Sequence, residues 1–105
     1  MMYDMVALDD ELLRVLADPL RAAMVRALAV EQLCTCHLVE LTGARQTNVS
    51  NHLRILRQAG LVEAEPAGRY TYYRLRPDCL GQLAEQFGIL AEAAQHAEAV
   101  RRPCA

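Results

Sequence analysis

Apolar residues recur every three or four positions along most of this chain, which is the spacing of one face of a helix. Leu20, Met24 and Leu28, for example, follow one another at intervals of four residues. The pattern predicts helices over about residues 9–16, 18–29, 36–41, 46–60 and 78–100. Because leucine, alanine and valine dominate the apolar residues and only 5% of the chain is aromatic, we expect helical structure to prevail.

Residues with special backbone or capping preferences mark several of these helix ends. Asp18 and Pro19 match a helix N-cap followed by proline at the first helical position. Gly43 suits the left-handed backbone position that ends the third helix. Asp78 is expected to be the N-cap of the last helix.

The periodicity changes after Gly60, where apolar and polar residues begin to alternate. Residues 61–65 and 70–75 are predicted to form two strands, and residues 66–69 to connect them. The sequence therefore predicts a mostly α fold with one small β-hairpin, an α+β arrangement in a single domain over residues 1–105.

The order of the predicted elements is typical of a winged helix-turn-helix. The helix-turn-helix spans about residues 36–60, and the hairpin wing follows at about residues 61–76. The helix over about residues 78–100 has a long apolar stripe, formed by Leu80, Leu83, Phe87, Leu90, Ala91 and Ala94. Because a monomer of this size would expose that stripe, we expect a homodimer that forms through the first and last helices.

The helix over residues 46–60 has an apolar face and an opposite face without a single acid. Val49, Leu53 and Leu56 are expected to anchor the helix to the core, which turns hydroxyl, amide and guanidinium groups outward. Such groups bind phosphates and base edges in the major groove, and an arginine at the wing tip reaches the backbone or minor groove. The predicted contacts to double-stranded DNA are Gln46, Thr47, Ser50, Asn51, His52, Arg54, Arg69 and Tyr72.

Charge is distributed unevenly along the chain and supports this interpretation. The net charge is −2, but residues 44–76 carry six arginines and two acids, which gives +4. The remainder carries five arginines and eleven acids, which gives −6. A basic segment in an acidic protein is typical of a face that meets phosphate. The alternatives are a polar face that is merely solvated and, for His52, a packing role beside a buried leucine.

Two of the four cysteines, Cys34 and Cys36, form a Cys-x-Cys pair where the chain enters the third helix. In extended or helix N-terminal geometry, side chains at i and i+2 can turn to the same side, so that two thiolates share one ion. A helix N-terminus also lowers the pKa of a thiol, which favours the thiolate. The alternative is a pair of small buried residues, because cysteine is often buried.

Four segments stand in order along the chain, ADPLR at 17–21, EQLCTC at 31–36, QTNVSNHLRILRQAGLV at 46–62 and GRYTYYRL at 68–75. Together they resemble the ArsR/SmtB family of dimeric metal-responsive repressors, over about residues 12–80. The resemblance implies a repressor that covers its own operator-promoter when it is metal-free. It also implies that the first and last helices form the dimer interface.

Within this resemblance, Cys34 and Cys36 correspond to the third-helix thiolate site of arsenic-, antimony- and cadmium/lead-responsive members. The implied inducer is As(III) or Sb(III), with Cd(II), Pb(II) or Zn(II) as the alternative. Three sulfurs satisfy trivalent arsenic, and Val39 stands where some arsenic-responsive members have their third cysteine. Cys104 in the C-terminal tail is the favoured third ligand, ahead of an outside thiol and of Cys79, which is expected to pack.

Nitrogen donors point to other ions. His37 suits zinc or cadmium better than arsenic. The last-helix zinc site of other family members is absent, because Ala91 and Ala94 occupy its later positions and His96 is out of register. A thiol-redox repressor of the same fold and a soluble metal- or arsenite-sequestering protein are the remaining alternatives.

Other classes of protein find no support in the chain. No set of nucleophile, histidine and acid and no phosphate-binding glycine loop is visible, so an enzyme is not expected. No apolar run approaches the roughly 20 residues of a membrane span, and the first residues lack the features of a signal peptide. These features predict a cytoplasmic protein with reduced thiols and no membrane contact.

Overall fold

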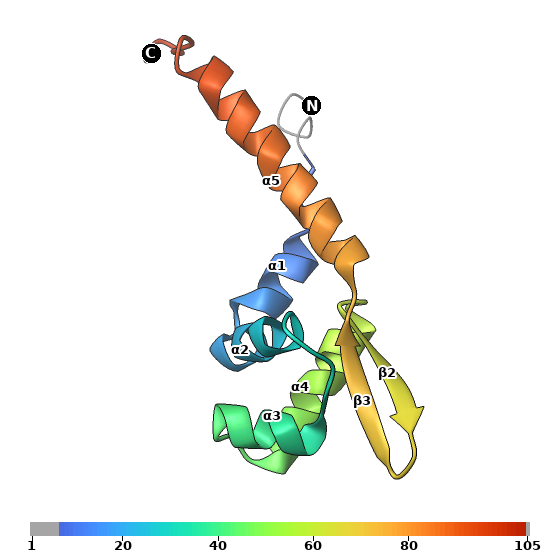
Figure 1. Ribbon diagram of the computed structural model, residues 1–105. Helices are drawn as coiled ribbons and strands as arrows, with labels where there is room; N and C mark the ends of the chain where they lie inside the picture. The colour runs from blue at the N-terminus through green and yellow to red at the C-terminus, as the bar shows by residue number, and fades with distance from the viewer. Residues whose placement is uncertain (1–6, 105) are drawn as a thin grey trace.

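The computed structural model describes residues 7–104. Figure 1 shows the helices and strands, which follow in the order α1 (Asp10–Ala17), α2 (Pro19–Leu28), β1 (Leu33–Cys34), α3 (Thr35–Thr42), α4 (Gln46–Gln58), β2 (Val62–Ala67), β3 (Tyr70–Leu75) and α5 (Pro77–Ala97). The predicted mostly α fold with a small hairpin wing is confirmed, and each predicted helix is present with ends within three residues of those expected.

Aspartate side chains cap the first two helices. The Asp9 carboxylate accepts the backbone N–H of Leu12 at 3.0 Å and so begins α1. Asp18 Oδ1 accepts the backbone N–H groups of Leu20 and Arg21 at 2.9 and 3.0 Å, and Pro19 is the first residue of α2. The predicted start of the second helix is therefore confirmed.

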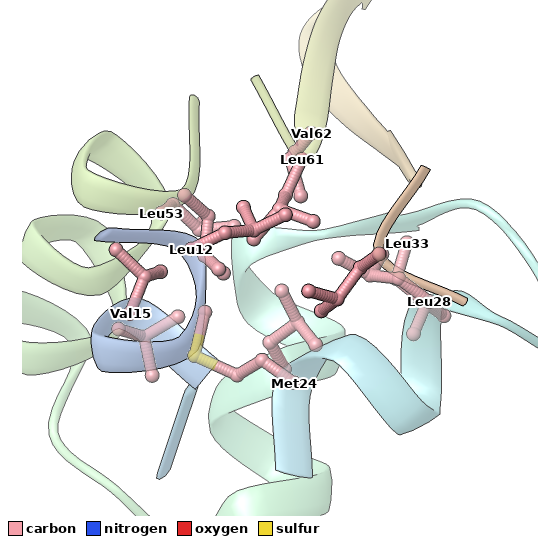
Figure 2. Close-up of a cluster of buried hydrophobic side chains, with 12 residues drawn as sticks. Leu12, Val15, Met24, Leu28, Leu33, Leu53, Leu61 and Val62 are labelled. Atoms are coloured by element: carbon pink, nitrogen blue, oxygen red, sulfur yellow. The ribbon is translucent and has the colours of Figure 1, made fainter. Parts of the chain in front are cut away.

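The helix-turn-helix is made by α3 and α4. Gly43 has a φ of 72°, and this left-handed conformation lets the chain leave α3 and turn toward α4. Val49, Leu53 and Leu56 on the inner face of α4 are fully buried, as the sequence predicts. Figure 2 shows how the core joins side chains from α1, α2, β1 and α4 to Leu61 and Val62 at the start of the wing.

A three-stranded antiparallel sheet replaces the expected two-stranded hairpin. The strand order is β1-β3-β2, and Cys34 in β1 pairs with Tyr72 in β3. The predicted connection over residues 66–69 is too long, because Pro66 pairs with Thr71 and the turn is shortened to residues 68 and 69. Proline is tolerated there because β2 is an edge strand.

Helix α5 starts earlier than predicted. Arg76 is the N-cap residue and Pro77 the first helical residue, so the prediction of Asp78 as N-cap is wrong. The Asp78 carboxylate instead accepts from the Arg76 side chain at 2.9 Å. Figure 1 shows α5 extending away from the other elements, and the molecule measures 64 × 23 × 22 Å. Neither α5 nor another helix of residues 7–104 has the length and apolarity needed to cross a membrane.

Candidate nucleic-acid interface and metal centre

The outer face of α4 presents the polar groups that the sequence predicts. Because three apolar residues of the helix point into the core, the opposite side chains are exposed, and these are Gln46, Thr47, Ser50, Asn51 and Arg54. Arg54 Nη2 donates to Asn51 Oδ1, which holds an amide and a guanidinium together on this face. The first turn of α4 contains no acid, so the positive end of the helix dipole is not neutralised locally.

The tip of the wing carries one exposed guanidinium. Arg69 lies in the two-residue turn between β2 and β3, next to Tyr70, which is 57% exposed. Figure 1 shows the wing tip and the α3–α4 pair at the same end of the molecule, opposite the C-terminal end of α5. At the base of the wing, Arg74 and Arg76 pair with Glu63, so part of the positive charge of this segment is neutralised within the protein.

Two of the predicted DNA contacts, His52 and Tyr72, have close partners within the protein. His52 is half-buried, and its Nδ1 lies 3.0 Å from Arg21 Nη1. Tyr72 is also half-buried and faces the thiol pair from β3. Sequence patterns predict which face of an element a residue occupies, but they do not reveal these partners from distant segments.

The thiol pair lies at the N-terminus of α3, together with a histidine. Cys34 is the last residue of β1 and the N-cap of α3, and Cys36 and His37 follow in the first turn. Their sulfur and ring nitrogen atoms all lie within 4.8 Å of one another. The structure therefore brings together the two predicted thiolates and adds an imidazole, a donor set suited to a thiophilic ion.

A reciprocal capping box holds this first turn. The backbone N–H of Cys34 donates to His37 Nδ1 at 3.1 Å, and the Cys34 side chain accepts from the backbone N–H of His37. The arrangement is that of the Ser/Thr-x-x-Glu capping box, with cysteine and histidine in its place. The spacing of three residues between Cys34 and His37 is the sequence signal from which this contact was predictable.

The two thiols differ in acidity. Burial raises the pKa of Cys34, but hydrogen bonds from the Cys36 thiol and from the backbone N–H groups of His37 and Cys36 outweigh it, so the pKa lies below its ordinary value. The hydrogen bond that Cys36 donates to Cys34 raises the pKa of Cys36, as do burial and the negative charge on Cys34. Cys34 is therefore the more acidic thiol of the pair and Cys36 the less acidic one.

The wing forms one wall of this site. A cavity of about 180 Å³ is lined by Cys34, Cys36, His37, Tyr70 and Tyr72. The rings of His37 and Tyr72 have centroids 6.2 Å apart and are tilted by 52°. A group bound between the sulfurs would therefore touch both the start of α3 and the strand β3.

The other cysteines lie apart from the pair. Cys79 Sγ donates to the backbone carbonyl of Gly60 at 3.2 Å and joins the edge of the core, as expected for a packing residue. Cys104 is exposed beyond the C-terminal end of α5, and Figure 1 shows this end of the chain far from α3. Within residues 7–104 of one chain, His37 rather than Cys104 is the third donor beside the thiols.

Comparisons with known proteins identify the family. The sequence model of the bacterial regulatory protein arsR family matches residues 18–64. A solved structure of a possible transcriptional regulator for arsenical resistance is 32% identical, with a TM-score of 0.70, and the match covers 90% of this chain and 100% of the other. The chain belongs to the arsR family of bacterial regulatory proteins. The resemblance seen in the sequence is thus confirmed, as is the expectation of a regulator rather than an enzyme.

This arsR-family protein is also similar to the HTH-type transcriptional repressor SmtB of Mycobacterium tuberculosis strain H37Rv. The identity is 41% over 87 residues, which cover 83% of this chain and 60% of the relative, so the chain spans about three-fifths of that relative's length. A homodimeric winged helix-turn-helix DNA-binding domain from Mycobacterium bovis has a TM-score of 0.60 and 29% identity, over 90% of this chain and 89% of the other.

Proposed function

We propose that this protein is a dimeric transcriptional repressor that binds double-stranded operator DNA and releases it when Cys34 and Cys36 capture a thiophilic ion. The observation that carries the proposal is the position of the thiol pair. Cys34 begins α3, the first helix of the helix-turn-helix, and it pairs with Tyr72 of the wing strand. An ion bound there acts on both elements that would contact DNA.

Operator recognition is proposed for α4 and the wing. The exposed amides and hydroxyls of α4 suit base edges and phosphates in the major groove. Arg69 at the wing tip suits the DNA backbone or the minor groove. The repressor SmtB and the homodimeric DNA-binding domain among its relatives support both DNA binding and the dimer.

Release is proposed to follow from the change in the first turn of α3. Two sulfurs that bind one ion leave the hydrogen bonds that they make in the metal-free protein, so the start of α3 and the wall formed by Tyr72 move. The operator-binding face then fits the two half-sites less well. Because the linkage is reciprocal, operator DNA weakens ion binding by the same factor.

Arsenite and antimonite are the first candidate ions. Their affinity for sulfur matches the Cys34–Cys36 pair, and the similar structure described for arsenical resistance supports this choice. Each thiol condenses with As(OH)₃, forming one As–S bond and releasing one water, without a change in oxidation state. The third sulfur comes from Cys104 of the second chain of the dimer or from an external thiol, because Cys104 follows α5, whose C-terminal end is far from α3 within one chain.

Cadmium or zinc is the second candidate, and a specific observation favours it. His37 offers an imidazole nitrogen within 4.8 Å of both sulfurs. Two thiolates and one imidazole are a common ligand set for a zinc-like ion, with a fourth position open to solvent or a further residue.

The proposal is tested by fluorescence anisotropy with the DNA upstream of the protein's own reading frame, under reducing conditions. The wild type should prefer this DNA over random duplex and release it when arsenite or cadmium is added. Cys34→Ser and Cys36→Ser should bind the DNA normally but resist release. Normal release by both variants, or no preference for the promoter at moderate ionic strength, would sink the proposal.

Two further variants separate the ions. His37→Gln keeps an acceptor for the Cys34 backbone N–H but lacks the imidazole, so it should lower the affinity for cadmium and zinc and leave the arsenite response unchanged. Cys104→Ser should reduce the number of sulfurs around arsenic from three to two, as counted by X-ray absorption. An unchanged count would assign the third sulfur to another thiol.

A further inference from the structure

Helix α4 is tied to the rest of the molecule by a guanidinium that spans three helices. Arg21 in α2 donates from Nε to the backbone carbonyl of Val15 in α1 at 2.7 Å. Its Nη1 lies 3.0 Å from Nδ1 of His52 in α4. Within residues 7–104, no other side-chain hydrogen bond joins α4 to another helix or strand.

The contact determines which nitrogen of His52 carries the proton. A guanidinium offers five donors and no acceptor, so His52 Nδ1 must be the acceptor. The ring is then neutral and carries its single proton on Nε2. His52 therefore uses Nδ1 to accept from Arg21, and only Nε2 remains as a donor.

This hydrogen bond is directional, whereas the other contacts of α4 with the core are not. Val49, Leu53 and Leu56 anchor the helix through apolar packing, which is non-directional. A hydrogen bond weakens steeply when its angle departs from linear, so the Arg21–His52 contact resists rotation of α4 about its own axis. Since His52 lies between Asn51 and Arg54 in the sequence, the same rotation would redirect the polar face.

Arg21 also bonds α1 through Nε, so it fixes the orientation of α4 relative to α1. The two α4 helices of a dimer must match two half-sites at a fixed spacing, so their orientation relative to the dimer interface affects operator affinity. Asp18 lies beside the pair: hydrogen bonding from the backbone N–H of Arg21 and the charge of Arg21 hold the pKa of its carboxyl below the ordinary value despite partial burial. Asp18 thus places a negative charge near the guanidinium and holds the backbone of Arg21 at the start of α2.

We infer that Arg21 and His52 are a positioning pair, in which Arg21 sets the orientation of α4 against α1 and His52 is its acceptor instead of a DNA contact. The inference rests on the proposed DNA-binding function. It assigns a role to two residues that do not touch the operator, and it replaces the expectation from the sequence that His52 binds DNA.

Matched substitutions at His52 test the pair. In His52→Asn the amide oxygen lies near the position of Nδ1, whereas in His52→Gln the amide lies near that of Nε2. His52→Asn should keep operator affinity within about threefold, and His52→Gln and Arg21→Met should each lose about tenfold or more. Combining Arg21→Met with His52→Gln should add little to either loss, because both remove the same contact.

Two readouts distinguish positioning from contact. The slope of log affinity against log salt should be unchanged in Arg21→Met, whereas loss of a phosphate contact would lower it by about 1. Nitrogen NMR of the free protein should show His52 protonated on Nε2 alone, with this signature lost in Arg21→Met. Circular dichroism and melting curves verify that each variant folds.

The outcomes separate this inference from the proposed function. Wild-type protein that binds its promoter while Arg21→Met and His52→Gln bind equally well would overturn the positioning pair alone. So would a proton on His52 Nδ1, or an affinity lost in His52→Asn but kept in His52→Gln. A wild type without promoter preference would overturn both.

Discussion

At the scale of single residues, the chemistry of the thiol site depends on the unequal acidity of its two thiols. Cys36 donates to Cys34, so the pKa of Cys34 lies below and that of Cys36 above the ordinary thiol value. The residue types and their spacing were visible in the sequence. The direction of each shift depends on burial and on the backbone N–H groups of the first turn of α3, which only the folded chain supplies.

The first prediction concerns the pH dependence of ion binding. Cadmium binds both sulfurs as thiolates and expels the protons that they hold, so the affinity for cadmium should rise with pH until Cys36, the less acidic thiol, deprotonates. Because the pKa of Cys36 is raised, the rise should extend above the ordinary thiol range. Competition with a chromophoric chelator between about pH 6 and 9 measures it.

A flat profile over this range would contradict the prediction, because both thiols would then already be ionised and the pKa of Cys36 would not be raised. Arsenite provides a contrast, because As(OH)₃ condenses with thiols and releases water, so its affinity should lack this rise.

The second prediction concerns the exposed guanidinium at the wing tip. Arg69→Gln should weaken DNA binding about equally for all sequences and lower the salt slope by about 1, since Arg69 is free to meet phosphate. Arg74→Gln is the matched control, because Arg74 pairs with Glu63 at the base of the wing. Equal slopes for the Arg69 variant and the wild type, measured by anisotropy at several salt concentrations, would count against a wing contact.

At the scale of elements, the short strand β1 connects the thiol site to the wing. Its two residues are too few for an alternating pattern, so the sequence did not predict it. Pairing of Cys34 with Tyr72 places a wing residue over the thiols. The predicted hairpin was correct, but its pairing with β1 depends on residues almost forty positions away in the chain.

The third prediction tests this connection. Tyr72→Thr removes the ring that lies beside His37 and keeps a residue suited to a strand, so ion affinity should stay within about threefold. The factor by which the ion weakens operator binding should fall about fivefold or more, because couplings of this kind are typically 5- to 150-fold. Tyr72→Phe keeps the ring and should retain the coupling.

Parallel titrations of operator with and without ion measure that factor. A Tyr72→Thr variant that releases DNA as completely as the wild type would show that the signal travels through α3 and α4 alone.

At the scale of the whole molecule, the single chain is unusually extended. Its radius of gyration is 18.0 Å, whereas a compact domain of this length has about 13 Å. Helix α5 runs for 21 residues yet buries only Leu83 among its described side chains, and Phe87 and Ile89 are 46% and 48% exposed. Phe87 belongs to the apolar stripe that the sequence assigns to a dimer, and the homodimeric relative supports that assignment.

The fourth prediction concerns the dimer. Phe87→Glu should convert the protein to a monomer, because it introduces a charge into the exposed apolar face of α5. Operator affinity should then fall about 100-fold, since the second half-site no longer binds as part of the same particle. Gln82→Glu, on a different side of the helix, is the control. Analytical ultracentrifugation decides the outcome, and a dimeric Phe87→Glu protein would place the interface elsewhere.

Much of this architecture can be predicted from local sequence patterns. The helices, the Asp18 and Gly43 boundaries and the polar face of α4 follow from periodicity and capping, which involve residues within about one turn of each other. The Cys-x-Cys pair is likewise local, and so is its place at a helix N-terminus. The family follows from the order of these same segments.

Tertiary structure alone decided which distant residues meet. Tyr72 faces the thiols, Arg21 binds His52, and Cys104 lies at the far end of the molecule from Cys34. None of these outcomes has a periodic signal, because each depends on how whole elements pack around one core. Local patterns determine what each element is and which side it buries, whereas packing determines what its polar side chains touch.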